Sequence, residues 1–156
     1  MNDICFEFNN KCFIYRVGAI IIRNNKLLMA TNPNVTFYYT VGGRVLFGES
    51  SQEALLREVR EEIGIELEID RLAFINESYY RIYENKKMAH EIALYYIMKD
   101  NDTLDDIAMN YKDGTYNNTL KWFNIKDLNK QYIYPEFLKY ELLNLSNGIK
   151  HIITIE

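Results

Sequence analysis

The chain has 156 residues, of which 48% are hydrophobic and 14% are aromatic. This length is enough for one domain with a sizeable core and too short for two ordinary domains. The net charge of −4 and the pI of about 5.3 argue against a general nucleic-acid binder, which would carry a basic stripe. We therefore expect a single domain over residues 1–156 that binds phosphate groups locally, without an overall positive field.

The cysteines and the apolar runs indicate the cellular environment. Cys5 and Cys12 form no Cys-x-x-Cys pair and have no neighbouring histidine, so we interpret them as reduced thiols and not as zinc ligands. No apolar run approaches the roughly 18 residues of a membrane span, and the first residues lack the pattern of a secretion signal. The expected location is the cytoplasm, without a membrane partner.

The first 41 residues predict strands separated by short turns. Residues 15–23 are almost continuously apolar, which is typical of a strand covered on both faces and implies layers on both sides of a sheet. The other predicted strands are a hairpin over residues 1–14, a return strand over residues 26–31 after Asn24-Asn25, and a short aromatic strand over residues 37–41.

A capped helix is predicted over residues 51–63. Ser50 is a suitable N-cap, Glu53 follows three residues later as in a capping box, and Gly64 lies just past the last apolar residue. At 100° per residue the helix has two separate stripes. The apolar stripe consists of Leu55, Leu56, Val59 and Ile63, and the acidic stripe consists of Glu58, Glu61 and Glu62. Three like charges on one face repel each other, so this face needs a compensating cation.

The spacing of the charged residues and glycines around this helix is specific. Gly43 is followed after five residues by Glu49, and then after seven residues by Arg57-Glu58-Val59-Arg60-Glu61-Glu62-Ile63-Gly64-Ile65. This stretch resembles, position for position, the signature box of the Nudix hydrolases. The resemblance is strong over residues 42–65 and moderate for the order of the elements around them.

The resemblance implies a site that binds divalent metal, usually Mg²⁺ and sometimes Mn²⁺, and hydrolyses a phosphoanhydride in a nucleoside diphosphate linked to another group. It implies that Glu58, Glu61 and Glu62 bind the metal, with Glu62 the most constant ligand and the identity of the general base open. The resemblance implies a supporting or metal-side role for Glu49, and it implies that Arg57 orients a glutamate of the box by an ion pair. Clustered carboxylates agree with this expectation, because Mg²⁺ prefers hard oxygen ligands.

The glycines before the helix have expected roles as well. The resemblance implies a metal-ligand position at the backbone carbonyl of Gly42. Gly42 and Gly43 allow the backbone to approach metal and phosphate closely and to adopt positive φ. We expect these two glycines and Arg44, the basic residue nearest to them, to contact the substrate.

The rest of the chain predicts further strands and one more helix. We expect strands over residues 65–69, 72–75, 79–83, 91–98 and 120–125, with a turn over residues 84–87. Residues 99–119 predict a polar loop with at most a short helix at 104–109, and residues 135–145 predict a helix. The tail over residues 149–155 forms either a last strand or a contact between two copies. Two helices around a sheet buried on both faces predict an α/β fold, the α/β/α sandwich with a mixed sheet that the resemblance also implies.

The residues that would select the substrate are harder to identify from the sequence than the residues of the signature box. A further carboxylate or base is expected from a later loop, and the candidates are Asp113, Asp105, Asp106 and Glu91. Tyr83 lies near the position where dinucleoside polyphosphate hydrolases of this family carry a tyrosine, but with 13 tyrosines in the chain this does not select a substrate. Nucleoside triphosphates, nucleotide sugars, ADP-ribose and dinucleoside polyphosphates all stay open, with a small nucleotide as the expected partner.

Two other classes of function compete with hydrolysis. A Nudix-fold module that senses a nucleotide without cleaving it would be favoured by degenerate glutamates in the box, and none is degenerate here. An isoprenoid diphosphate isomerase would need a cysteine and a glutamate in the site, and Cys5 and Cys12 lie too early in the chain.

Overall fold

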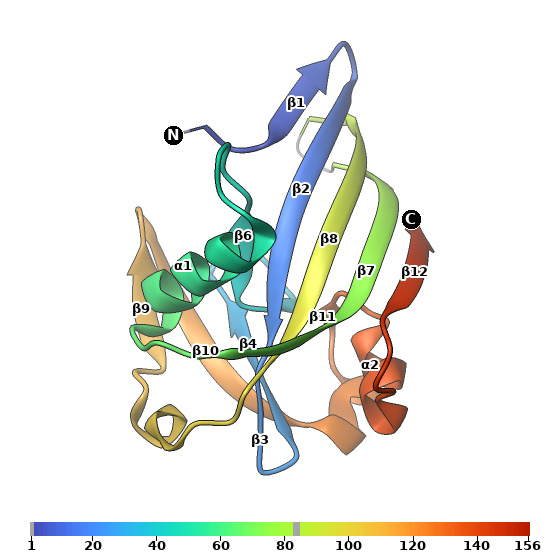
Figure 1. Cartoon of the computed structure of the whole chain (residues 1–156). Helices are drawn as coiled ribbons and strands as arrows, with labels where there is room; N and C mark the ends of the chain where they lie inside the picture. Colours follow the sequence, from blue (N-terminus) through green and yellow to red (C-terminus); the bar gives the residue numbers. More distant parts are fainter. Residues whose placement is uncertain (1, 83–84) are drawn as a thin grey trace.

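The computed structural model describes residues 2–82 and 85–156, and it consists mainly of two mixed β-sheets with two α-helices (Figure 1). The first sheet has the strand order β1-β2-β8-β7-β12, with β6 paired to β2. Its strands are β1 (Cys5–Phe8), β2 (Lys11–Ile20), β6 (Gly42–Arg44), β7 (Ile69–Arg81), β8 (Met88–Met98) and β12 (Lys150–Ile155). Strand β2 runs parallel to β8, and β7 runs parallel to β12.

The second sheet has the order β11-β5-β4-β10-β9, with β3 paired to β4. Its strands are β3 (Ile22–Arg23), β4 (Lys26–Thr31), β5 (Tyr38–Tyr39), β9 (Asn110–Asp113), β10 (Tyr116–Asn124) and β11 (Ile133–Tyr134). The turn between β3 and β4 has positive φ at both Asn24 and Asn25, at 51° and 58°. Two such residues are what a tight hairpin of this twist requires.

The helices lie over different cores. Helix α1 (Ser51–Ile63) packs its apolar stripe on a core that includes Val17, Ala19, Leu28 and Tyr96. Helix α2 (Leu138–Glu141) packs Leu138 on a second core that includes Ile20, Leu27 and Phe74. The remaining helical segments are the 3₁₀ turns η1 (Asp102–Asp106), η2 (Ile125–Lys130) and η3 (Leu142–Asn144). Val17 and Ala19 of β2 belong to the first core, and Ile20 belongs to the second. Strand β2 is therefore covered on both faces, as predicted and as an α/β layered fold requires.

Two predictions on the path from α1 to η1 differ from the structure. Residues 65–68 form no strand, although Leu67 is buried while Glu66 and Glu68 are exposed. The alternation of buried and exposed side chains arises because Leu67 packs in the same core as α1, but the hydrogen-bonded strand β7 begins only at Ile69. Residues 72–75 and 79–81 of the predicted segments belong to a single strand, β7, which ends at Arg81 and pairs with β8 across two register irregularities. Part of the predicted turn at 84–87, together with Tyr83, lies outside the described residues.

The predicted polar loop over residues 99–119 is wrong for its second half. Residues 110–124 form the hairpin of β9 and β10, which turns at Gly114 with φ 56°. Strand β10 then pairs with β4 over six residues. The asparagines and lysine of this hairpin have low strand propensity, so its pairing is decided by the sheet it joins.

The predicted helix over residues 135–145 is also much shorter than expected. Only Leu138–Glu141 is α-helical, and bonds such as Lys139 N–H to the Glu136 carbonyl at 3.1 Å are of the tighter 3₁₀ type. Leu138 and Leu142 are buried, whereas Leu145 is exposed. The core therefore covers only about one turn of the apolar stripe, and nothing favours a longer helix.

The C-terminal tail forms strand β12, which confirms one of the two alternatives predicted for it. Strand β12 pairs with β7 from Lys150 to Ile155 and lies at the edge of the first sheet. Ile153 and Ile155 are exposed on this edge strand. A contact between two copies of the chain through this edge stays a prediction.

Candidate active site

Local interactions fix both ends of helix α1, which carries the acidic stripe. The Ser50 hydroxyl accepts a hydrogen bond from the Glu53 N–H at 3.2 Å, and the Glu53 carboxylate accepts one from the Ser50 N–H at 2.7 Å. Gly64 ends the helix in the left-handed conformation, at φ 79°. The capping box and the glycine stop confirm the predicted helix at both ends.

The three stripe carboxylates lie in different environments. Glu62 is buried at 8% exposure, Glu58 is partly buried, and Glu61 is exposed. Burial, followed by the neighbouring charge of Glu58, raises the pKa of Glu62 to about 8. Burial also raises the pKa of Glu58, against the opposing effect of Arg57. Two adjacent acids whose pKa values are raised mainly by burial are typical of a functional site.

Arg57 connects the helix to the loop before it. Its guanidinium donates to both carboxylate oxygens of Glu49, at 2.7 and 3.2 Å, and to Glu58 at 2.7 Å. It also reaches Glu61 at 3.3 Å and the backbone carbonyl of Arg44 at 3.1 Å. Glu49 in turn accepts the Leu46 N–H at 2.8 Å, and the Arg57 charge lowers the pKa of Glu49. Arg57 thus orients Glu58, while Glu49 holds Arg57 in place.

The two glycines of β6 lie directly against these carboxylates. The Gly42 N–H donates to Glu62 at 3.3 Å, and Gly42 has φ 147°. A Cβ on Gly42 would fall 2.2 Å from the Val17 carbonyl oxygen, and a Cβ on Gly43 would fall 2.3 Å from a Glu58 carboxylate oxygen. Neither position has room for a side chain, which is the physical reason for glycine at both.

A cavity of about 630 Å³ opens next to Glu62. Its lining comes from both sheets and from α1, and it is rich in aromatic and amide side chains. The aromatic residues in the lining are Phe37, Tyr39, Tyr80, Tyr95, Tyr116, Tyr132 and Tyr134. This volume is in the range of ligand pockets, and the aromatic walls suit a planar ring.

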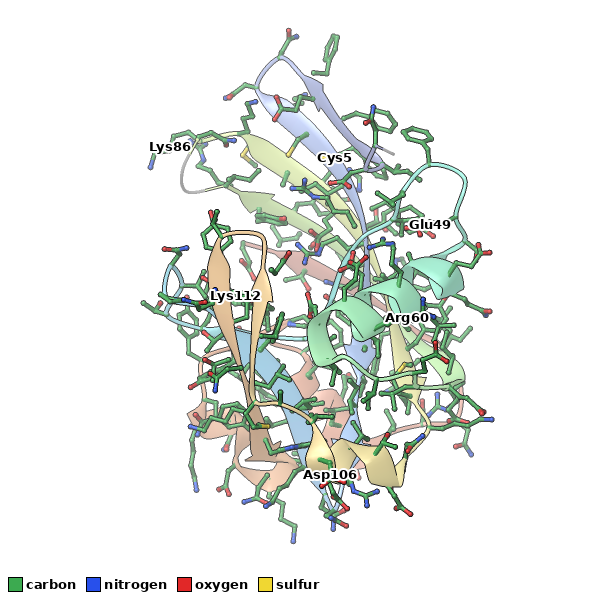
Figure 2. The ribbon with its side chains drawn as sticks, turned by 90° about the vertical axis from the view of Figure 1, so that its left-hand side faces the viewer. Cys5, Glu49, Arg60, Lys86, Asp106 and Lys112 are labelled. Carbon is green, nitrogen blue, oxygen red and sulfur yellow. The ribbon has the colours of Figure 1, made fainter. Side chains whose placement is uncertain are left out.

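The tertiary structure separates the four candidates for an additional carboxylate. Asp113 and Glu91 line the cavity together with Glu62. Asp105 instead pairs with Arg23 at 2.8 Å. Figure 2 shows Asp106 at the end of the molecule far from Glu49, which lies on the loop that leads into α1. Asp113 and Glu91 are therefore the two candidates that share a cavity with the acidic stripe.

Arg44 is placed differently from the expectation of a substrate contact. Its guanidinium pairs with Asp3 at 3.1 Å and its side chain is 45% exposed. Arg44 is not part of the cavity lining, whereas Arg16 and Arg81 are. Substrate contact by Arg44 stays a prediction that the geometry does not favour.

Sequence reasoning missed Arg16, Asn118 and Asn76. Arg16 interrupts the apolar run of β2 and faces the cavity, and this interruption was the signal that could have identified it. Asn118 and Asn76 are buried at 4% exposure and also line the cavity. Asparagine occurs often in this chain, so no sequence pattern singled these two out.

Replacing Arg57 by lysine (Arg57→Lys) is expected to lower kcat at least about tenfold, because a lysine cannot hold Glu49 and Glu58 at once and misplaced groups are costly in catalysis. The measurement is steady-state hydrolysis of the best substrate, with circular dichroism to verify folding. Arg60→Lys is the matched control, since Arg60 lies on the same helix but pairs only with the exposed Glu66 in the described part of the chain. Equal activity of the two variants would contradict the role assigned to Arg57.

Comparisons with known proteins agree with this geometry. A family model described as NUDIX domain matches residues 13–141. The RNA pyrophosphohydrolase of Orientia tsutsugamushi (strain Boryong) is 24% identical over an alignment of 163 residues, which covers 98% of this chain and 88% of that protein. The ADP-ribose pyrophosphatase of Methanocaldococcus jannaschii is 27% identical over 135 residues, covering 85% of this chain and 74% of that protein. The crystal structure of a MutT protein from Bacillus halodurans has the same fold, with a TM-score of 0.65 at 17% identity over 88% of this chain and 86% of that one.

Proposed function

The chain belongs to the NUDIX family, and on that premise we propose that it is a metal-dependent pyrophosphohydrolase. It cleaves a phosphoanhydride bond in a nucleoside diphosphate joined to another group. The observation that carries the proposal is the position of Glu58 and Glu62 on α1, with Glu62 lining a cavity of nucleoside size. The family match over residues 13–141 supports the class of reaction.

The residues present fit a divalent metal. Glu58 and Glu62 lie one turn apart on α1, and the charge of Glu58 acts on Glu62. Mg²⁺ keeps several waters and is commonly bound by one or two carboxylates together with substrate phosphates, so two such carboxylates suit it. Glu58 and Glu62 are the proposed protein ligands, and Glu61, Glu49 and the Gly42 carbonyl are the further candidates near them.

When bound, such an ion neutralises phosphate oxygens and activates water. The other functions fall to the chain itself. Arg57 fixes the direction of the Glu58 carboxylate, and the Gly42 N–H holds Glu62 at the cavity. The attacking water loses its proton to one of these carboxylates as the bond from phosphorus to the leaving phosphate breaks in line.

The extent and setting of the protein are also proposals. We infer one domain over residues 1–156, because each sheet combines strands from distant parts of the chain. Within the described residues, the helices are all too short or too polar to cross a membrane. The cytoplasmic location stays a prediction.

The decisive experiment is Mg²⁺-dependent product formation across a substrate panel. The panel contains the four nucleoside triphosphates, UDP-glucose, ADP-ribose, a dinucleoside tetraphosphate and an RNA with a 5′-triphosphate, the last because one relative is named an RNA pyrophosphohydrolase. We expect one class to be cleaved and the reaction to stop when EDTA removes the metal, since the carboxylates alone repel a phosphate. Binding without turnover across the whole panel would favour the sensing module, and a rearranged diphosphate would indicate an isomerase.

A further inference from the structure

The floor of the cavity is one face of the first sheet and carries a row of polar side chains. In the pairing of β2 with β8, Arg16 lies opposite Ala93 and Ile14 opposite Glu91, so Arg16 and Glu91 are on the same face in neighbouring strands. Strand β7 adds Ser78, which lies opposite Glu91. The sheet thus brings a guanidinium and a carboxylate side by side on the floor of a cavity.

Both groups have hydrogen-bonding capacity that is left unused. The Arg16 guanidinium forms no hydrogen bond and no ion pair within 4.0 Å with any described residue, although Glu91 has the largest of the charge effects that raise its pKa. Glu91 is 8% exposed, and its Oε2 accepts the Tyr80 hydroxyl at 3.1 Å. Its Oε1 has no partner among residues 2–82 and 85–156. The nearby acidic groups stabilise the Arg16 charge, while the Arg16 N–H groups and Glu91 Oε1 stay available as donors and acceptor for a bound ligand.

A third polar atom in the lining is also without a partner. Asn118 projects from β10 in the second sheet, is 4% exposed, and its Oδ1 accepts no hydrogen bond from the described residues. Arg16 offers donors, Glu91 Oε1 offers an acceptor, and Asn118 offers an acceptor from another sheet. A ligand that matches them presents both donors and acceptors.

The charges in the cavity favour a heterocyclic ring over a second phosphate at this position. The described lining contains the acidic residues Glu62, Glu91, Asp113, Glu136 and Glu156 but only two basic ones, Arg16 and Arg81. A phosphate beside Arg16 would also face Glu91, whereas a neutral ring with mixed edges satisfies both. Tyr95 and Tyr39 supply aromatic surface from the two sheets.

We propose that Arg16 and Glu91 determine substrate specificity by binding the edge of a nucleobase that carries an exocyclic amino group, with Glu91 accepting from the amino group and Arg16 donating to a ring or carbonyl acceptor. This pairing follows the general preference of carboxylates for base amino groups and of arginine for base acceptors. Uracil and hypoxanthine, which lack the amino group, bind less well. The inference rests on the proposed function in that the ligand is a nucleotide.

The test compares nucleotides with and without the exocyclic amino group: GMP and IMP differ only at this group, while CMP and UMP, and AMP and IMP, differ also at the neighbouring ring nitrogen. Binding within each of these three pairs is measured by isothermal titration calorimetry with Mg²⁺ present, and the monophosphates contain no anhydride that could be cleaved during the measurement. We expect at least one amino-bearing nucleotide to bind about tenfold to a hundredfold more tightly than its counterpart, the effect of losing a hydrogen bond to a charged group. Failure of all three pairs to discriminate would overturn the proposal, even if the substrate panel showed hydrolysis.

A variant of Glu91 tests whether this residue causes the discrimination between bases with and without the amino group. Glu91→Gln is expected to reduce the discrimination ratio to within about threefold, because an amide both donates and accepts. Glu136→Gln is the matched control, since Glu136 lines the same cavity but is exposed and pairs with Lys139. An unchanged ratio in Glu91→Gln would contradict the assignment.

Arg16 is tested separately, because its loss also removes a charge from the cavity. Arg16→Lys keeps the charge but loses the planar fork, and we expect it to weaken binding of the preferred nucleotide about tenfold. Inorganic diphosphate is the second probe. If Arg16→Lys or Arg16→Met weakens diphosphate binding as much as nucleotide binding, Arg16 binds an anion and the base-binding role is wrong. Base discrimination without hydrolysis of any panel substrate would instead uphold this inference and refute the proposed function.

Discussion

Replacing Glu62 by glutamine (Glu62→Gln) is expected to lower kcat at least about a hundredfold while the protein stays folded. Glutamine keeps the volume of the side chain and can still accept the Gly42 N–H, but it removes the charge that binds the metal. Each factor of ten in rate corresponds to about 1.4 kcal/mol of transition-state stabilisation. A hundredfold loss is therefore smaller than the several kcal/mol of transition-state stabilisation that a bound metal supplies. Steady-state turnover at saturating Mg²⁺ measures the effect.

The same variant has an opposite expected effect on the stability of the metal-free protein. The carboxyl of Glu62 has a pKa of about 8 in the folded protein, against an ordinary value of 4.5. The folded state therefore retains a proton that the unfolded state releases, and the protein loses stability as the pH rises from 4.5 to 8. Glu62→Gln removes this loss and should stabilise the metal-free protein at pH 8 by on the order of 3 kcal/mol.

Thermal melts in EDTA at pH 5 and pH 8 measure this second effect. The wild-type melting temperature should fall between the two pH values more steeply than that of Glu62→Gln. Glu66→Gln is the control for both experiments, because Glu66 is an exposed carboxylate just past the same helix. Near-normal turnover by a folded Glu62→Gln protein would refute the assignment of Glu62 to the metal site.

Replacing Gly42 by alanine (Gly42→Ala) is expected to destabilise the fold by about 3 kcal/mol. The new Cβ would lie 2.2 Å from the Val17 carbonyl oxygen and 2.9 Å from the Gly18 Cα, and the backbone has φ 147°. Both neighbours are backbone atoms of β2, so neither can rotate away as a side chain would. In a protein of this size the change corresponds to roughly 10 °C in melting temperature, which urea and thermal unfolding both measure.

Gly43 and Gly148 provide the contrasts for this experiment. A Cβ on Gly43 would meet the carboxylate end of the Glu58 side chain, which can shift more easily than backbone atoms at the cost of its bond to Arg57, so Gly43→Ala should reduce activity with a smaller loss of stability. A Cβ on Gly148 would point into open space, with no packing neighbour within 4 Å among the described residues, so Gly148→Ala should be nearly neutral. If Gly42→Ala melts within about 2 °C of wild type, the close packing of β6 on β2 is not the reason for glycine at this position.

The interpretation of the chain as a Nudix hydrolase depended on residues close together in the sequence, and the family match confirms it. Ser50, Glu53 and Gly64 determine the ends of α1 through contacts within three or four residues. Arg57 and Glu58 are likewise neighbours on that helix. Such contacts depend on spacing alone, which is why the helix and its acidic stripe could be predicted.

The elements predicted incorrectly depend on distant partners. Residues 110–119 have the composition of a loop, but they form β9 and the start of β10, because β10 pairs with β4, about 90 residues earlier in the chain. The C-terminal helix had the periodicity of a longer helix, but the core ends at Phe137, Leu138 and Leu142, and Leu145 is exposed. In both cases tertiary packing overrides local preference.

The sequence by itself thus determined the family, the layered α/β fold and the acidic helix with its glycine entry, because these follow from local spacing and periodicity. Only the tertiary structure decided which residues share the cavity. Arg16, Glu91 and Asn118 come from three strands of two sheets and meet at the cavity through strand pairing and the packing of the sheets. A strand register places each side chain on one face or the other, and no local signal in the sequence specifies which distant strand will be its neighbour.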